Sequence, residues 1–139
     1  MASLTAIRNG LAANLATVPN MTVNKYVVLQ PRPPVFIIRP HPDTLVEHHG
    51  AMREGMQLWH MIVEAWAGTL NEAEQAQQLL DVLCSSGASS VRAAIEADPT
   101  LGGAVGQAMV ARCRNYREFA TPEGAWIISA TWDIDVITN

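Results

Sequence analysis

The sequence is poor in the residues from which nucleic-acid surfaces are usually built. Among its 139 residues are 9 lysines and arginines and 13 aspartates and glutamates, so the formal net charge is −4. A general nucleic-acid binder normally carries a basic stripe or patch. The charge balance therefore argues against that class, although it leaves open a protein that only encircles DNA.

Cysteine is also scarce, since only Cys84 and Cys113 occur. Two cysteines far apart in unlike contexts indicate neither a disulfide framework nor a zinc site. We expect two buried free thiols in a reducing compartment.

The chain has no apolar run long enough to cross a bilayer, and its start lacks the basic-then-apolar order of a signal peptide. The sequence therefore predicts a cytoplasmic protein with no membrane partner.

The most regular pattern that is present lies in the segment 124–137. Every second residue there is apolar: Trp126, Ile128, Ala130, Trp132, Ile134 and Val136. The alternate positions include Ser129, Thr131, Asp133 and Asp135. A period of two over this length predicts one long strand with a buried face and a solvated face. Both tryptophans are expected on the buried face.

Apolar spacing and turn residues predict the other elements. Helices are expected over 3–16, 71–83 and 90–97, the second with Asn71 as the N-cap of a capping box. Strands are expected over 21–29, 35–38, 57–66 and 106–116, and a long loop over 41–56. The order α-β-β-β-α-α-β-β predicts a single α+β domain over 1–139. Its mostly antiparallel sheet of about five strands would carry helices on one face.

The last two strands are expected to form a hairpin across the turn 121–124. In the first of these strands Met109, Ala111 and Cys113 would share one face, and Val110, Arg112 and Arg114 the other. The two arginines would then lie on the solvated face with Asp133 and Asp135. Opposite charges across a sheet contribute a few tenths of a kcal/mol each. A salt-bridged surface is therefore favoured over an acid–base pair.

The histidines are the natural candidates for a metal site or a general base. The only four are His41, His48, His49 and His60, and three of them fall in the loop 41–56. Zinc ligands usually form tight pairs with a second pair at a distance, whereas His48 and His49 are adjacent. No HExxH, CxxC or GxSxG motif is present. The sequence therefore predicts no catalytic residue, no metal and no cofactor.

Four ordered segments resemble those of one family. They are Ala6–Leu15 followed by Thr17-Val18-Pro19-Asn20, the proline-rich stretch Pro33–Pro40, the stretch Ser90–Val105 with its Ala-Asp-Pro-Thr-Leu-Gly-Gly run, and Ala111–Tyr116. In this order they are similar to the tail terminator proteins of long, non-contractile-tailed phages that infect actinobacteria. The resemblance spans nearly the whole chain, and the loop 41–56 matches least.

This resemblance implies a small α+β subunit that forms a ring, a hexamer, on the head-proximal end of the finished tail tube. There the ring would stop tube polymerisation and join the tail to the neck. The implied partners are further copies of the chain, the major tail tube protein and neck or head-completion proteins. DNA would pass through the lumen without sequence-specific binding. The implied location is the virion, after assembly in the host cytoplasm, and no catalysis is implied.

A ring with heterologous contacts needs two different complementary patches on each subunit. The hairpin residues Arg112, Arg114, Asp133 and Asp135 are expected to contribute to these patches, because charge is scarce elsewhere in the chain. The loop residues Arg53 and Glu54 are expected to do the same, because their loop is unusually long.

Three other interpretations stay open from the sequence. A head-closure or stopper protein of the neck also forms a ring, and a subunit of a contractile tail or secretion tube is a further structural alternative. A small cytoplasmic metal- or ligand-binding protein that uses the histidine-bearing segment 41–60 belongs to a different class.

Overall fold

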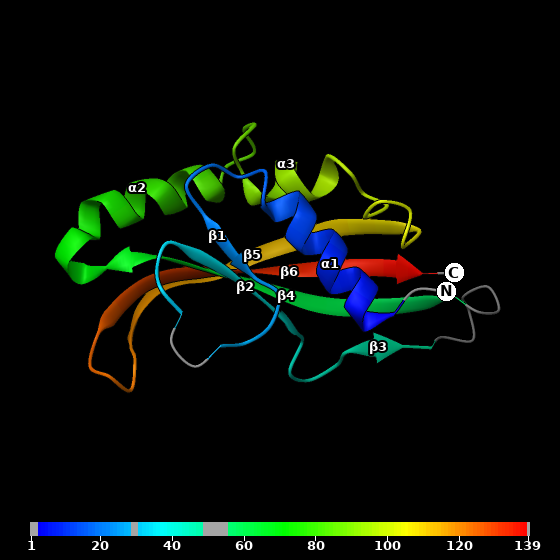
Figure 1. Ribbon diagram of the computed structural model, residues 1–139, viewed down its shortest axis with the longest axis horizontal. Coiled ribbons are helices and arrows are strands. Elements are labelled where there is room, and N and C mark those ends of the chain that lie inside the picture. The colour runs from blue at the N-terminus through cyan, green and yellow to red at the C-terminus, as the bar shows by residue number, and fades with distance from the viewer. Residues whose placement is uncertain (1–2, 29–30, 49–55, 139) are drawn as a thin grey trace.

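The computed structural model describes residues 3–28, 31–48 and 56–138. Within these ranges the chain forms three α-helices, one 3-10 turn and six strands of a single sheet (Figure 1). The helices are α1 (Leu4–Leu15), α2 (Ala73–Leu83) and α3 (Val91–Glu96), and η1 (Leu70–Glu72) is the 3-10 turn. The strands are β1 (Thr22–Asn24), β2 (Val35–Pro40), β3 (Val46–Glu47), β4 (Gln57–Thr69), β5 (Gln107–Ala120) and β6 (Trp126–Thr138).

The sheet is mostly antiparallel, and its strand order is β1-β2-β4-β6-β5. Only β1 and β2 run parallel to each other. The short strand β3 adds to β4, where Val46 pairs with Trp59 and Glu47 with Leu58. The predicted α+β class is therefore confirmed. The sheet has six strands where about five were expected, because a pair of residues in the expected loop 41–56 forms β3.

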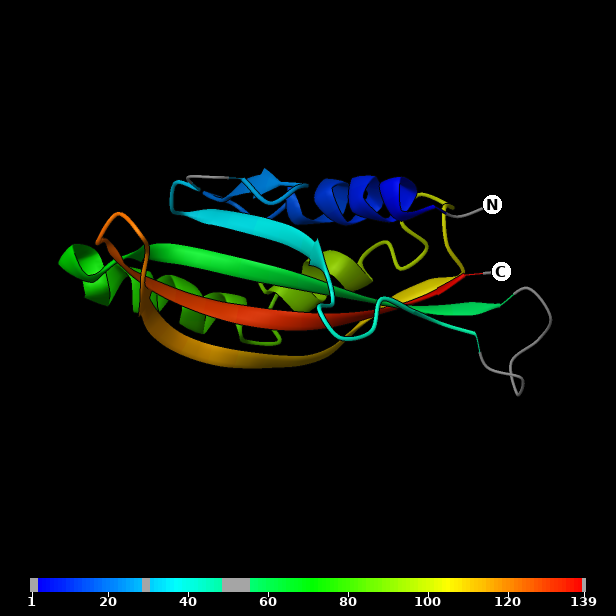
Figure 2. The ribbon, with the colours of Figure 1, turned by 90° about the horizontal axis from the view of Figure 1, so that it is seen from below.

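All three helices contribute to one core on one face of the sheet, which is called the helix face below. Figure 2 shows β2, β4, β6 and β5 in succession, with α2 and α3 behind them. On this face the strands present Phe36, Ile38, Met61, Val63, Trp132 and Ile134, all fully or almost fully buried. The opposite face is called the outer face.

Helix α1 is fixed at both ends by side-chain hydrogen bonds. The Ser3 hydroxyl accepts a hydrogen bond from the Ala6 backbone N–H at 3.1 Å, which is the usual N-cap arrangement. Near the other end the buried Asn14 side chain donates to the carbonyl oxygens of Ile95 and Asp98 at 3.1 and 3.0 Å. Carbonyl groups at the end of a helix have no partner within it. Asn14 therefore ties α1 to the end of α3.

Several predicted boundaries are wrong. Strand β1 ends at Asn24 instead of continuing to 29, whereas β4 continues to Thr69 and β5 to Ala120. The predicted Asn71 N-cap is also wrong, because Asn71 lies inside η1 and Glu72 takes the N-cap position of α2 without a side-chain hydrogen bond. The chain leaves β4 directly into the tighter 3-10 turn, so the first helical position comes later than the sequence pattern indicated.

The predicted faces of β5 are wrong at its start. Val110 pairs with Ile134 and Arg112 pairs with Asp133, so one extra residue, Ala111, lies between the two pairs. A bulge of this kind shifts the alternation of side chains by one position. Val110 consequently faces the helices and Met109 the outer face, the reverse of the prediction. After the bulge Arg112 and Arg114 lie on the outer face and Cys113 pairs with Trp132, as predicted.

The two tryptophans of β6 have different environments. Trp132 is 2% exposed within the core, whereas Trp126 is 51% exposed at the first position of the strand. The prediction that both are buried is therefore wrong for Trp126. A period of two identifies the face on which a side chain lies, but the burial also depends on whether another element covers that position.

Candidate interaction surface

The outer face carries a group of charged side chains, which form the charged face: Arg39, Glu47, His60, Glu64, Arg112, Arg114, Asp133 and Asp135. They come from all of the strands except β1. The pairing of β4 with β6 and of β6 with β5 places them near one another, since His60 lies opposite Asp135 and Arg112 opposite Asp133.

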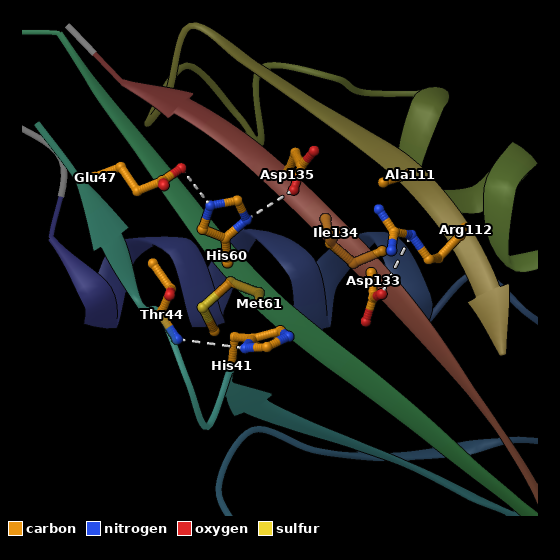
Figure 3. A pocket seen from close by; sticks show the side chains of 10 residues that line it. All are labelled: His41, Thr44, Glu47, His60, Met61, Ala111, Arg112, Asp133, Ile134 and Asp135. Carbon is orange, nitrogen blue, oxygen red and sulfur yellow. Dashed lines mark hydrogen bonds and ion pairs between the residues drawn. The ribbon is translucent and has the colours of Figure 1, made fainter. Parts of the chain in front are cut away.

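Asp133 is the centre of an arginine cluster formed with Arg112 and Arg114, and Figure 3 shows its pair with Arg112. The Arg114 Nε atom lies 3.0 and 3.1 Å from the two carboxylate oxygens of Asp133, and the Arg112 Nε atom lies 3.5 Å from one of them. The Asp133 side chain is only 13% exposed, while that of Arg112 is 69% exposed. Arg114 therefore serves mainly to neutralise Asp133, and most of the Arg112 guanidinium remains open to a partner.

Asp135 pairs with a histidine and not with the arginines. Its Oδ1 atom lies 3.0 Å from His60 Nδ1, and Glu47 Oε2 lies 2.8 Å from His60 Nε2. The four side chains thus share one face, as expected, and within it both arginines pair with Asp133 while Asp135 pairs with His60. The bulge at Ala111 places Met109 opposite Asp135, so β5 offers Asp135 no arginine there.

The two carboxylates determine the protonation of His60. Partial burial alone would lower the pKa of His60, but the hydrogen bonds and charges of Glu47 and Asp135 together raise it above the ordinary value of 6.5. The protonated imidazole can donate to both carboxylates at once, and the neutral ring can donate to only one. This ion triplet links β3, β4 and β6.

A cavity of about 280 Å³ opens between the histidine triplet and the arginine cluster (Figure 3). His41 lies on its wall, and its Nδ1 atom accepts hydrogen bonds from the backbone N–H groups of Asp43 and Thr44 at 3.2 and 3.4 Å. The ring nitrogens of His60 are both directed at carboxylates. Among the residues that the structure describes, no group of three or more histidine, cysteine or acidic side chains is arranged to hold a metal ion.

Sequence reasoning found part of this surface. Arg112, Arg114, Asp133 and Asp135 all lie on the outer face, as the alternation in the last two strands indicated. Arg53 and Glu54 lie outside the described residues. Sequence reasoning considered His60 only as a metal ligand or general base, and it missed Glu47. The alternation over 57–66 does place His60 and Glu64 on one face of β4, but their partners depend on the order of the strands in the sheet.

The two edges of the sheet differ in character. Strand β5 forms one edge, and its side chains from Ala111 onward are mostly exposed and include Arg112, Arg114 and Arg117. Strand β1 forms the other edge, and after Lys25 the side chains of Tyr26, Val27 and Val28 are exposed, with Arg8 stacked on the Tyr26 ring. The β5 edge is therefore rich in exposed arginine, whereas the β1 edge exposes apolar side chains next to Arg8 and Lys25.

No helix in the described parts of the chain is long and apolar enough to span a membrane.

Comparisons of the chain with protein-family models and with curated proteins found no match.

Proposed function

We propose that this chain is a structural subunit that forms a ring on the head-proximal end of a phage tail tube. The ring ends polymerisation of the tube and joins the tail to the head. Its partners are further copies of the chain, the major tail tube protein and the neck proteins, and DNA passes through its lumen without sequence-specific contacts. The protein would assemble in the host cytoplasm and remain in the virion.

The observation that carries this proposal is the ordered set of four segments that resemble tail terminator proteins over nearly the whole chain. The α+β fold is compatible with it, because that class was expected from the resemblance as well as from the element pattern. A net charge of −4 and the neutralisation of Asp133 by arginine suit a ring that surrounds DNA without holding it.

The unlike edges of the sheet supply the kind of surfaces that a ring needs. A heterologous contact joins one patch to a different patch on the next copy, and repetition closes the ring. The edge of β5 presents Arg112 and Arg117, and the opposite edge presents Tyr26 and Val27. The Arg8 guanidinium of the same copy already covers one face of the Tyr26 ring, 4.7 Å from its centroid, so Val27 is the more open apolar side chain of that edge. We therefore assign the subunit contact to these two edges, with the Arg112 region of one copy against the Val27 region of the next.

Electron microscopy of lysates from a phage that lacks this gene tests the proposal. Overlong tubes without heads are the expected result, because tube growth would have lost its stop. A plasmid copy of the gene should restore tails of uniform length.

Other results would contradict the assignment in distinct ways. Tails of normal length beside unattached heads would move the protein to head closure in the neck. Ordinary infectious particles would contradict both structural roles, and the cavity beside His41 and His60 would then be the place to search for a small ligand.

A further inference from the structure

The two cysteines, which the sequence places 29 positions apart, lie side by side in the structure. The Cys84 Sγ atom is 3.5 Å from the Cys113 Sγ atom. Both residues are exposed, so the expectation of two buried thiols is wrong. Cys84 follows the last residue of α2, and Cys113 lies in β5 opposite Trp132. No pattern in the sequence indicates this contact, because it depends on how α2 lies across the sheet.

We infer that Cys84 and Cys113 form a reversible intrachain disulfide that fastens the end of α2 to β5. An S–S bond is about 2.05 Å long, so the two sulfur atoms, which lie 3.5 Å apart, need to approach each other by about a further 1.5 Å. Helix α2 ends at Leu83 and Cys84 is its C-cap, so the chain after Cys84 is not helical. This inference does not depend on the proposed ring.

Neighbouring contacts hold α2 in the position that the disulfide needs. The Tyr116 hydroxyl of β5 donates to Asp81 Oδ1 at 3.3 Å and lies 3.5 Å from the Gln77 carbonyl oxygen. The buried residues Leu80 and Leu83 fix the other side of the helix in the core. The two thiols therefore approach each other in the folded state without a rearrangement of the sheet.

A shallow hollow of about 370 Å³ gives a small oxidant access to both sulfur atoms. Arg92 and Arg112 line it together with Cys84 and Cys113. Both arginines are already paired with carboxylates, Arg92 with Glu96 and Arg112 with Asp133, so they give the hollow little net charge. Oxidised glutathione is a disulfide that can supply the oxidising equivalents. One cysteine thiolate attacks a sulfur atom of oxidised glutathione, which releases one glutathione thiolate. The second cysteine thiolate displaces the second glutathione, so two protein thiols are oxidised and one glutathione disulfide is reduced to two thiols.

The reaction is expected to be slow at neutral pH. Partial burial of the sulfur atom, the adjacent Cys113 and the negative charge of Asp81 raise the pKa of Cys84 to about 12. Partial burial and the negative charge of Asp133 raise the pKa of Cys113, although the hydrogen bond with Cys84 lowers it. The thiolate is the attacking species. The rate of disulfide formation should therefore increase about tenfold for each unit of pH between about 7 and 9.

Incubation of the purified full-length chain with oxidised glutathione tests the inference. Both thiols should disappear, and a peptide that links Cys84 to Cys113 should appear by mass spectrometry. The melting temperature should rise by several degrees, and dithiothreitol should reverse every change.

Cys84→Ser and Cys113→Ser are the matched controls, each with one thiol. Under reducing conditions both should melt within a few degrees of the native chain, and with oxidised glutathione neither should gain stability. Covalent dimers, stable glutathione adducts on the native chain or unreacted thiols after prolonged incubation at pH 9 would each overturn the inference.

Discussion

His60 is the residue whose charge matters most to the outer face, since it joins carboxylates from two other strands. Its pKa is raised by Glu47 and Asp135 despite partial burial. When the pKa of a group is higher in the folded state than in the unfolded state, protonation of that group stabilises the fold. The stabilisation is complete at pH values below the unfolded-state pKa. This stabilisation is lost as the pH rises through the folded pKa. The contribution of His60 is therefore present below about pH 6.5 and absent well above it.

We predict that His60→Gln will reduce the dependence of stability on pH. The native chain should lose roughly 2–4 °C more in melting temperature than the variant between pH 6 and pH 8, because a partly exposed ion pair is worth at most about 1 kcal/mol. Thermal denaturation at both pH values checks this.

Asp135→Asn provides the matched control for this prediction. It removes one carboxylate but leaves the imidazole, so an NMR titration should show a His60 pKa lower than in the native chain. A native His60 pKa at or below 6.5 would contradict the prediction.

At the scale of elements, the position of α1 depends on a close approach to the turn after α3. A Cβ atom built on Gly10 would lie 2.4 Å from the Leu101 Cβ atom. Leu101 is buried and has a φ of 51°, so its backbone is already in the left-handed region. Glycine weakens a helix interior by about 1 kcal/mol relative to alanine. Gly10 is nevertheless required, because only glycine allows α1 and this turn to lie so close together.

We predict that Gly10→Ala will destabilise the protein by about 1–3 kcal/mol, although helix propensity alone would favour alanine. Urea denaturation measures the change. Gly87→Ala is the control, because its new Cβ atom would meet only the Ser85 Oγ atom at 3.5 Å, and it should change stability by less than about 0.5 kcal/mol. A Gly10→Ala protein as stable as the native chain would show that the turn at Leu101 moves freely.

The pairing of the edge strand β5 with β6 is a second feature at the scale of elements. Two irregularities interrupt its pairing with β6, one at Ala111 and one between Arg114 and Arg117. Bulges and charged side chains on an edge strand protect it from indiscriminate pairing with other strands. Contact between copies through this edge would therefore rely on side chains such as Arg112 more than on a continuous backbone ladder.

At the scale of the whole molecule, the proposed ring predicts that a charge reversal at the β5 edge will impair assembly and spare the fold. Arg112→Glu should reduce virion yield in a complementation assay at least tenfold. Its melting temperature should change by less than about 2 °C, because the Arg112 side chain is 69% exposed and Arg114 still neutralises Asp133.

Arg92→Glu is the matched control for this reversal, since Arg92 is a similarly exposed arginine that pairs with Glu96 within α3. It should leave the yield nearly unchanged. Equal yields from both variants would remove Arg112 from the subunit contact.

The sequence by itself determined the local elements and their faces wherever one pattern continued without interruption. The alternation over 124–137 predicted β6, and with the turn at 121–124 it predicted the hairpin and the outward position of Arg112, Arg114, Asp133 and Asp135. The apolar spacing over 3–16 likewise predicted α1, in which Ile7, Leu11 and Leu15 are buried. Such patterns are readable because side-chain direction repeats every two residues in a strand and every 3.6 in a helix.

The tertiary structure alone decided which distant residues meet. Strand order placed His60 beside Asp135, the bulge at Ala111 reversed Met109 and Val110, and the path of α2 brought Cys84 to Cys113. These outcomes depend on the packing of elements that are far apart in the chain. A periodic pattern within one segment carries no information on that packing, because it records only the face of its own element that is buried.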